Sequence, residues 1–241
     1  LLDEVGSSDR LPIGYELETA QPYSCLLSEF YCMCISGCDF SDLGRPFGNL
    51  ISYAEKYNVT LKAVRVNKAV NFDIPENAEV FETADDIRRL TEYLLGEFSK
   101  RNAAVPDYKK DSGDIERDSF MAEKFGRVFV IIDDMAEFCD IVHNTCDKRT
   151  VCDLLEDFIK NGKDHGVHFF GGYSSQKKTY LGLSDAFKSE NHGMHLGGKV
   201  NEQNALRIDI PLPEKIKTTQ PDNGWSVMDG RINSIFVPGK Q

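Results

Sequence analysis

A run of apolar residues that ends in two acids constrains the fold of this chain most strongly. Residues 127–135 read RVFVIIDDM, a run of β-forming residues followed by Asp133 and Asp134. A strand without polar alternation is buried on both faces, as in a parallel sheet covered by helices. Open sheets of this kind bind ligands outside the carboxyl ends of their strands. The run therefore predicts an α/β sheet and makes the two acids the first candidates for a site.

The other periodic segments alternate between strand and helix, which favours right-handed βαβ units with helices on both faces of the sheet. A helix is predicted over 82–102, with Thr83 as N-cap and Asp85 and Asp86 in its first turn. Further helices are predicted over 46–58, with Pro46 in the first helical position, and over 152–166. Further strands are predicted at 11–17, 23–29, 30–37, 59–67, 167–173, 193–198, 205–210, 224–229 and 232–238. Residues 103–122 are polar and are expected to form a mobile surface loop.

No composition shift divides the chain, so we expect a single domain over residues 1–241. Hydrophobic residues make up 41%, enough for one core, and no run has the length of a membrane helix. The chain does not begin with Met, and we expect it to be part of a longer protein. Any membrane anchor would then lie in the other part of that protein.

The charge balance disfavours nucleic acid as a partner. The chain has 28 Lys and Arg against 39 Asp and Glu, a formal charge of −11. Affinity for nucleic acid comes largely from cations that neutralise phosphates. The candidates for a basic patch are Lys109-Lys110 and Lys177-Lys178. Both runs are short, and we interpret them as solvated surface.

Seven cysteines are expected to be reduced, because a chain of this length folds without disulfides. Cys32 and Cys34 lie two apart in a strand and should point to the same face. No second cysteine pair with the spacing of a zinc knuckle accompanies them, and the pairs His165/His168 and His192/His195 stand apart. No metal site is predicted.

Two sequence segments have the order of a nucleotide-binding site. Residues 30–50, FYCMCISGCDFSDLGRPFGNL, run from strand through a Gly-containing loop into a helix, as a P-loop does. Asp133 then stands where a Walker B aspartate holds magnesium, and Asp134 stands where many ATPases place a catalytic Glu. KDHGVHFFGGYSSQ follows as the next strand. This order resembles the FtsK/SpoIIIE ATPase family, with Arg101 and Gly166-Val167-His168-Phe169 at matching positions.

A narrower resemblance is to the C-terminal ATPase-like domain of EssC/YukB-type proteins of type VII secretion. It is carried by Leu11-Pro12-Ile13-Gly14, by the segment 193–198 (GMHLGG), by Gln203 and by the turn 221–224 (PDNG). The resemblance implies a RecA-like P-loop NTPase fold on the cytoplasmic side of a membrane-anchored bacterial motor. It also implies two kinds of partner, namely other ATPase domains of that motor and small helical WXG-type secreted proteins.

The phosphate loop departs from the pattern G-x4-G-K-[ST], in which amides cradle phosphates, Lys reaches them and a hydroxyl binds magnesium. Counted from Gly37, the last three positions hold Asp42, Leu43 and Gly44. Counted back from Gly44, Arg45 takes the Lys position, Pro46 the hydroxyl position and Asp39 that of the first Gly.

The sensor position of the family is also changed, because Tyr173-Ser174 replaces Thr-Gln. We therefore expect a non-catalytic module without bound ATP or magnesium and assign no catalytic residue. It would serve in regulation, assembly or cargo docking. One alternative is slow ATP hydrolysis that uses Arg45 and Asp133, and a second is a DNA translocase domain. His168 and Trp225 are interpreted as packing residues, and a docking groove is sought near Trp225 or in 103–122.

Overall fold

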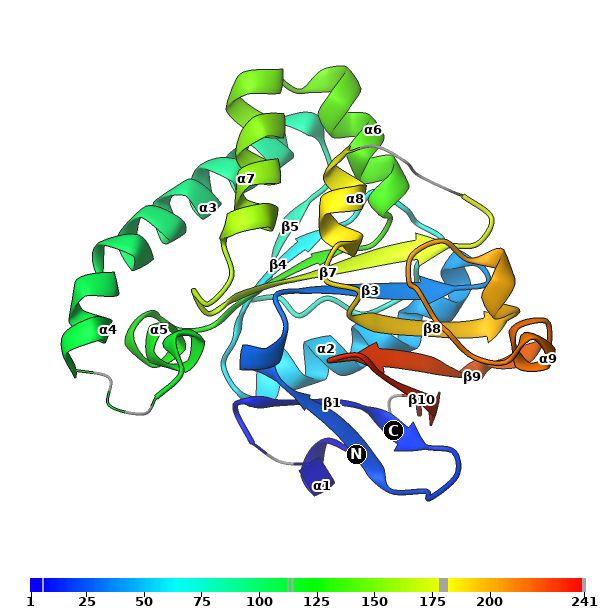
Figure 1. Cartoon of the computed structure of the whole chain (residues 1–241). Coiled ribbons are helices and arrows are strands. Elements are labelled where there is room, and N and C mark those ends of the chain that lie inside the picture. The colour runs from blue at the N-terminus through cyan, green and yellow to red at the C-terminus, as the bar shows by residue number, and fades with distance from the viewer. Residues whose placement is uncertain (6, 112, 114, 178–181, 240–241) are drawn as a thin grey trace.

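The computed structural model describes residues 1–5, 7–111, 113, 115–177 and 182–239. Within these residues, ten strands form one sheet in the order β2-β1-β10-β9-β8-β3-β7-β6-β4-β5 (Figure 1). The strands are β1 (Arg10–Glu16), β2 (Pro22–Leu26), β3 (Cys32–Gly37), β4 (Thr60–Val64), β5 (Glu79–Phe81), β6 (Val128–Ile132), β7 (Val167–Ser174), β8 (Gly193–Gly198), β9 (Thr219–Met228) and β10 (Arg231–Phe236). The α-helices are α1 (Leu2–Val5), α2 (Gly44–Lys56), α3 (Ala84–Ala103), α4 (Val105–Asp111), α5 (Arg117–Phe125), α6 (Met135–Thr145), α7 (Asp153–Asn161), α8 (Gly182–Lys188) and α9 (Leu212–Lys215).

The six strands from β8 to β5 run parallel to one another, and β9, β10, β1 and β2 extend the sheet beyond β8 in antiparallel pairs. Three of the parallel strands, β3, β6 and β7, are buried throughout, as the run 127–135 predicts. The predicted mostly parallel α/β sheet is thus confirmed. Its carboxyl edge gathers the ends of β3, β6, β7 and β8.

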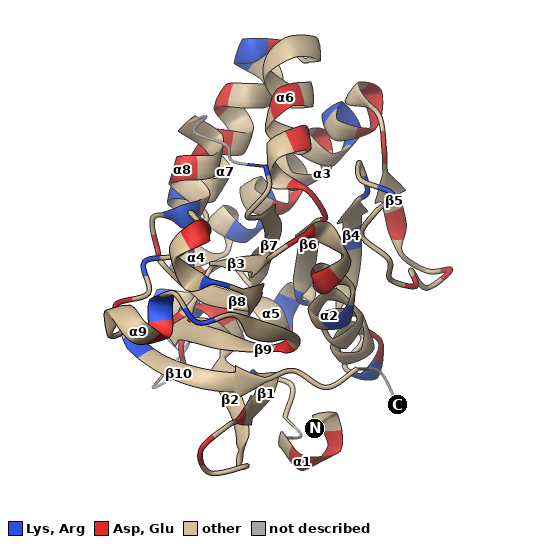
Figure 2. Ribbon diagram, turned by 90° about the vertical axis from the view of Figure 1, so that its right-hand side faces the viewer, with Lys and Arg blue, Asp and Glu red and all other residues tan. Residues whose placement is uncertain are grey.

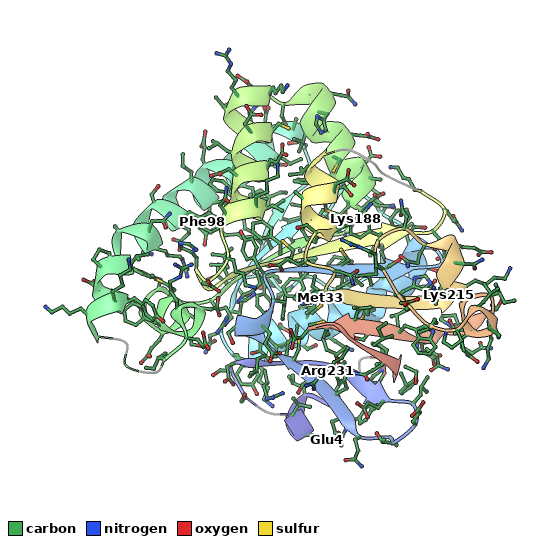
Figure 3. All side chains as sticks on the ribbon, viewed as in Figure 1. Glu4, Met33, Phe98, Lys188, Lys215 and Arg231 are labelled. Atoms are coloured by element: carbon green, nitrogen blue, oxygen red, sulfur yellow. The ribbon has the colours of Figure 1, made fainter. Side chains whose placement is uncertain are left out.

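The sheet separates two apolar layers. Figure 1 shows α3, α6, α7 and α8 on one face and α2 on the other. Cys32 and Cys34 pack into the first layer, whereas Met33 and Ile35 pack into the second, as strand alternation requires. Figure 3 shows Met33 in the interior and charged residues such as Glu4 and Arg231 at the periphery. The prediction that the two cysteines share a face is confirmed.

Helix α3 is the element that the sequence predicted best. The Thr83 side chain accepts a hydrogen bond from the Asp86 amide, and the Asp86 carboxylate accepts one from the Thr83 amide. This reciprocal cap satisfies donors that a helix start otherwise leaves unpaired. Ile87, Leu90, Leu94 and Phe98 are buried and secure the helix against the sheet, whereas Leu95 is exposed.

The prediction of a loop over 103–122 is wrong. The described part of this segment contains α4 and the start of α5. Asp118 and Met121 are buried, and Arg117 donates to the backbone carbonyls of Lys163 and Asp164. These contacts come from distant parts of the chain. They stabilise helices that the local sequence does not indicate.

Two further predictions are corrected. Helix α2 begins at Gly44, two residues before Pro46, because a 3₁₀ turn over Phe40–Leu43 leads into it. Residues 205–210 do not form a strand. Leu206 and Ile208 are buried there in an irregular segment that Gln203 and Asn191 hold by hydrogen bonds to its backbone. Helices α6 and α8 were not predicted.

Among the described residues, no helix has both the length and the apolar character needed to span a membrane.

Candidate functional site

The carboxyl edge of the parallel strands brings the predicted site residues together. Gly37 ends β3, Asp133 and Asp134 follow β6, and Ser174 ends β7. The loop from Gly37 to Gly44 connects β3 with α2 at this edge. The residues of the predicted loop and of the predicted Walker B strand are therefore neighbours in space, as the sequence order indicated.

The loop 37–44 is folded as a capped helical turn. The Asp39 carboxylate accepts a hydrogen bond from the Ser41 amide at 2.8 Å, and the Asp42 carboxylate accepts one from the Asp39 amide at 3.1 Å. The 3₁₀ turn Phe40–Leu43 then continues into α2. A phosphate-binding loop instead leaves such amides unpaired and directed at the ligand. Here the carboxylates of the chain itself take up these donors.

The Asp42 side chain is half-buried at this edge. Its Cβ is so close to Gly37 that no side chain would fit there, and its Oδ2 lies 3.2 Å from where a Cβ on Gly197 would be. Partial burial raises the pKa of the Asp42 carboxyl, an effect that the Asp39 amide partly offsets. Leu43, in the place of the P-loop lysine, is fully buried.

The backbone of the loop is tied to the neighbouring strands. The Cys38 amide donates to the Leu196 carbonyl at 3.1 Å, and the Ser175 amide donates to the Gly37 carbonyl at 3.0 Å. The Ser174 hydroxyl donates to the Cys38 carbonyl at 3.3 Å. The loop is thereby fixed between β7 and β8.

Asp133 binds a segment that crosses the same edge. Its Oδ1 accepts from the Val66 amide and its Oδ2 from the Asn67 amide, each at 3.0 Å. The side chain is completely buried, and burial raises the pKa of its carboxyl to about 6, although the two amides act in the opposite direction. Both carboxylate oxygens of Asp133, the residue at the Walker B position, therefore have backbone partners.

Asp134 is the N-cap of α6. Its Oδ1 accepts from the amides of Ala136 and Glu137 at 2.9 and 3.0 Å, and its Oδ2 accepts from the Asn67 side chain at 3.0 Å. Lys177 lies 3.6 Å from the same carboxylate and 2.7 Å from that of Glu137. Capping accounts for Asp134, since this geometry satisfies two unpaired amides at a helix start.

Residues 65–72 cover the start of α2, and we call them the closing segment. Val70 and Phe72 are buried in the layer around α2, where the rings of Phe72 and Phe47 lie 5.3 Å apart. The Asn71 carbonyl lies so close to Gly44 that a side chain at position 44 would collide with it. The hydroxyl of a P-loop Ser or Thr would require that space.

The other residues that the sequence singled out also make contacts within the fold. Arg45 is 3.4 Å from Asp222, and both are partly exposed. Tyr173, in the sensor position, points into the core with 3% of its surface exposed. Gln203 accepts from the amides of Ala205 and Leu206 and thereby forms a turn. Trp225 is partly buried against the core, in line with its interpretation as a packing residue.

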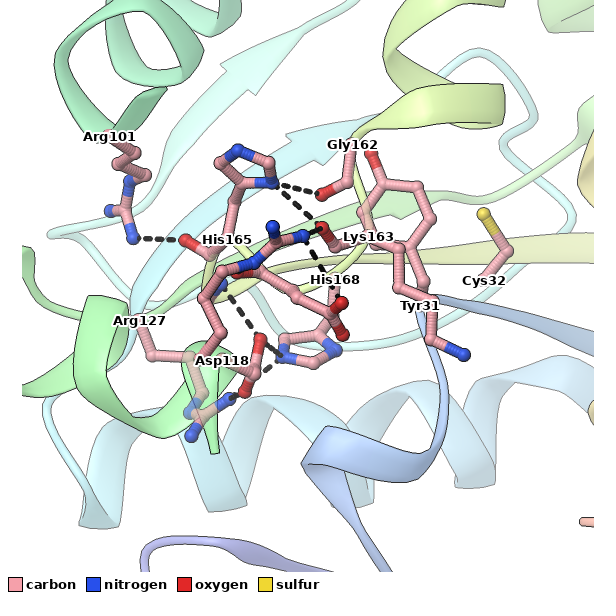
Figure 4. A network of polar contacts seen from close by, with 12 residues as sticks. Tyr31, Cys32, Arg101, Asp118, Arg127, Gly162, Lys163, His165 and His168 are labelled. Atoms are coloured by element: carbon pink, nitrogen blue, oxygen red, sulfur yellow. Dashed lines mark hydrogen bonds and ion pairs between the residues drawn. The ribbon is translucent and has the colours of Figure 1, made fainter. Parts of the chain in front are cut away.

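A second cluster of polar side chains lies at the opposite, amino edge of the sheet (Figure 4). Arg101 is completely buried and donates to Glu97 at 2.9 and 3.0 Å, to the His165 carbonyl at 2.6 Å and to the Gly126 carbonyl at 2.8 Å. It joins the end of α3 to the residues that lead into β6 and β7. The position that the resemblance singled out is thus a structural centre.

Asp118, Arg127 and His168 form the rest of this cluster. Arg127 Nη1 lies 2.5 Å from Asp118 Oδ2 and 2.8 Å from His168 Nε2, and Asp118 Oδ1 accepts from the Gly166 amide. Burial alone would raise the pKa of the Asp118 carboxyl, but interactions with His168 and Arg127 outweigh it and hold the pKa below its usual range. His168 is fully buried between aromatic rings, as expected for a core histidine.

Sequence reasoning missed the partners of these residues. Asn67, Asp118 and the internal role of Asp42 were not singled out. Only Asp42 carried a signal, because it stands three residues after Asp39, the spacing of a capping box. The other two act through contacts with residues far away in the sequence.

Cysteines and surface charges add no site of their own. All seven cysteines are free, and the described residues contain no group of His, Cys, Asp or Glu that could hold a metal ion. Lys109 and Lys110 are exposed, Lys177 pairs with acids, and Lys178 lies outside the described residues. Figure 2 shows Lys and Arg scattered among Asp and Glu.

No protein-family model matches the sequence, and no curated protein matches it significantly. Solved structures do match. EssC (ATPases 2 and 3) from Geobacillus thermodenitrificans superimposes with a TM-score of 0.73 at 12% identity, over 98% of this chain and 42% of that one. Thermomonospora curvata EccC (ATPases 2 and 3), in complex with a signal sequence peptide, gives 0.71 at 14% identity, over 100% and 42%. The pCW3 conjugation coupling protein TcpA with ATPγS gives 0.71 at 12%, over 97% and 67%.

The chain therefore has the fold of type VII secretion ATPase domains and of an FtsK-like coupling protein. The predicted RecA-like P-loop NTPase fold is confirmed. The chain spans less than half the length of the EssC and EccC chains that it matches.

Proposed function

We propose that this chain, which has the fold of the EssC and EccC ATPase domains, is a non-catalytic module of a type VII secretion motor. One observation carries the proposal. In the loop 37–44, amides that would hold phosphates are hydrogen-bonded to Asp39 and Asp42. Two carboxylates in that position also repel the phosphates of ATP.

The other parts of a working site are missing or already engaged. Leu43 offers no charge for the β and γ phosphates, and Gly44 offers no hydroxyl for magnesium. Asp133 has both oxygens hydrogen-bonded to backbone amides. Each of these features opposes hydrolysis independently, so a single substitution would not restore it.

A weakly active ATPase that uses Arg45 and Asp133 is the first alternative. Arg45 is partly exposed and lies near Asp222, so its charge is partly neutralised. Asp133 would have to release Val66 and Asn67 before it could hold a metal ion. The arrangement of these residues therefore favours the non-catalytic assignment.

A DNA translocase is the second alternative, and the likeness to a conjugation coupling protein gives it some support. The formal charge of −11 opposes it, because DNA affinity rises with the number of phosphates that Lys and Arg neutralise. We place the module among the other ATPase domains of a secretion motor, where it regulates them or contributes to assembly.

Cargo docking is a further part of the proposal, since EccC was solved with a signal sequence peptide. The place that we propose is a groove of about 190 Å³ between α3 and α7, whose lining combines apolar side chains such as Leu95 and Leu154 with polar ones. Phe98 and Phe158 stack at 4.9 Å in this groove, and Leu95 lies at its margin with 43% of its surface exposed. Small helical WXG-type secreted proteins are the expected ligands.

Calorimetry with ATP and magnesium, together with an assay of phosphate release, tests the central claim on the 241-residue chain. We expect no turnover above buffer and no binding tighter than millimolar. Low-micromolar binding with turnover would instead establish the first alternative. Retention of the chain on duplex DNA at physiological salt would establish the second.

A further inference from the structure

At the carboxyl edge of the sheet, groups of the chain itself occupy the positions that ligands occupy in a P-loop site. A P-loop site binds two charged groups, a phosphate at the loop amides and a magnesium ion near the Walker B carboxylate. In this chain both the loop donors and the Asp133 carboxylate have partners from the chain itself. In the loop, a carboxylate accepts the amide hydrogen bond that a phosphate would accept. At Asp133, two N–H donors face the carboxylate where a cation would otherwise lie.

The loop contains an internal anion. The Asp42 carboxylate lies between Gly37 and Gly197 and accepts the Asp39 amide at 3.1 Å. Both glycines are necessary, since a Cβ at Gly37 would collide with Asp42 and Gly197 has a φ of +67°. The surroundings of Asp42 are thus shaped to accommodate its side chain.

Asp133 has internal donors in place of a cation. One amide of the closing segment binds each oxygen, Val66 at Oδ1 and Asn67 at Oδ2. The Asn67 side chain also donates to Asp134, so that the same residue binds both acids of the strand end. Phe72 fixes the far end of the segment in the core.

We propose that the chain closes its own nucleotide edge, with the Asp42 carboxylate in place of a phosphate and the Val66 and Asn67 amides in place of magnesium. This inference rests on the proposed non-catalytic function and explains how the edge remains folded without a ligand. The closing segment is then a permanent part of the domain. Changes at this edge are driven by protein contacts and not by nucleotide.

Hydrogen exchange of three amides, followed by NMR on the whole chain, tests the inference. The amides of Asp39, Val66 and Asn67 are expected to be protected in the wild type, and millimolar MgATP should leave their rates unchanged. Asp133→Ala should accelerate exchange at Val66 and Asn67 roughly 10- to 100-fold, the cost of losing a hydrogen bond to a charged acceptor. Asp42→Ala should do the same at Asp39 alone.

Two further variants distinguish the loss of these hydrogen bonds from unfolding of the whole protein. Asp133→Asn retains the volume of the side chain and should accelerate one of the two amides more than the other, because only one acceptor oxygen remains. Asp73→Ala removes an exposed carboxylate beside the closing segment and should change none of the three rates. Unprotected amides in the wild type, without MgATP binding, would overturn this inference and leave the proposed function standing. MgATP binding with turnover would overturn both.

Discussion

The carbonyl oxygen of Asn71 lies against the Cα of Gly44, where a side chain would have to project. This contact places the closing segment directly over the start of α2. It also makes the absence of a side chain at position 44 a requirement of the fold.

Gly44→Ala is therefore expected to destabilise the protein. Inserting a methyl group into a packed position costs about 1–3 kcal/mol. Urea denaturation measures the change in the free energy of unfolding. Gly48→Ala in the same helix is the matched control, since a Cβ there would meet no atom within 4 Å. It should be neutral or stabilising by up to about 1 kcal/mol. If Gly44→Ala is as stable as Gly48→Ala, the closing segment moves aside freely and the contact with Asn71 does not constrain position 44.

Arg101→Met is expected to cost roughly 3–5 kcal/mol, because it leaves Glu97 and two carbonyls without their buried donor. The free energy of unfolding in urea is again the measure. Arg89→Met in the same helix removes an exposed arginine that pairs with Asp86, and it should leave the free energy of unfolding nearly unchanged. If the two variants are equally stable, the buried cluster is not the structural centre that we infer.

Stability is expected to fall in acid through His195. Burial lowers the pKa of its imidazole to about 4, and its Nδ1 lies 3.1 Å from the Ser36 hydroxyl. Because the folded pKa is below the unfolded value near 6.5, the stabilisation is complete above pH 6.5. It is lost as the pH falls towards 4, by roughly 3 kcal/mol in total.

His195→Gln isolates this contribution from the carboxyl groups that titrate nearby. The difference in unfolding free energy between wild type and variant should be constant above neutral pH and shift in favour of the variant between pH 6.5 and 4. A difference that does not depend on pH would contradict the burial of a neutral imidazole.

Leu95→Asp is expected to weaken binding of a cognate secreted protein at least tenfold, since a buried leucine contributes about 1.5–3 kcal/mol. Fluorescence titration with labelled cargo provides the Kd. Leu212→Asp is the control, because Leu212 is 67% exposed on α9, away from the groove. If cargo binds both variants as well as the wild type, the groove between α3 and α7 is not the docking site.

The cysteines should differ in reactivity with a thiol reagent. Cys38 and Cys146 are partly exposed and should react slowly in the folded protein. Cys34 should not, because it is buried and burial raises the pKa of its thiol to about 12. After denaturation all seven should react. Rapid reaction of Cys34 in the folded state would show that β3 is more accessible than the structure indicates.

The sequence by itself determined those helices and strands that are stabilised by contacts among their own residues. The buried run before Asp133 is recognisable without other information, because only a covered parallel strand tolerates apolar residues on both faces. Helix α3 is equally local, since Thr83 and Asp86 cap it within one turn. Helix α5 is not, because Asp118 and Arg117 obtain their partners from the residues that precede β6 and β7.

The same division applies to the site. The sequence was sufficient to place Gly37, Asp133 and Asp134 at one edge of a sheet and to predict that the loop departs from the pattern of a P-loop. It did not reveal that the Asp42 carboxylate accepts a hydrogen bond from an amide of that loop, or that the Val66 and Asn67 amides donate to Asp133. A hydrogen bond across more than sixty residues leaves no periodic pattern in a sequence. Only the folded chain brings its donor and acceptor within 3.0 Å.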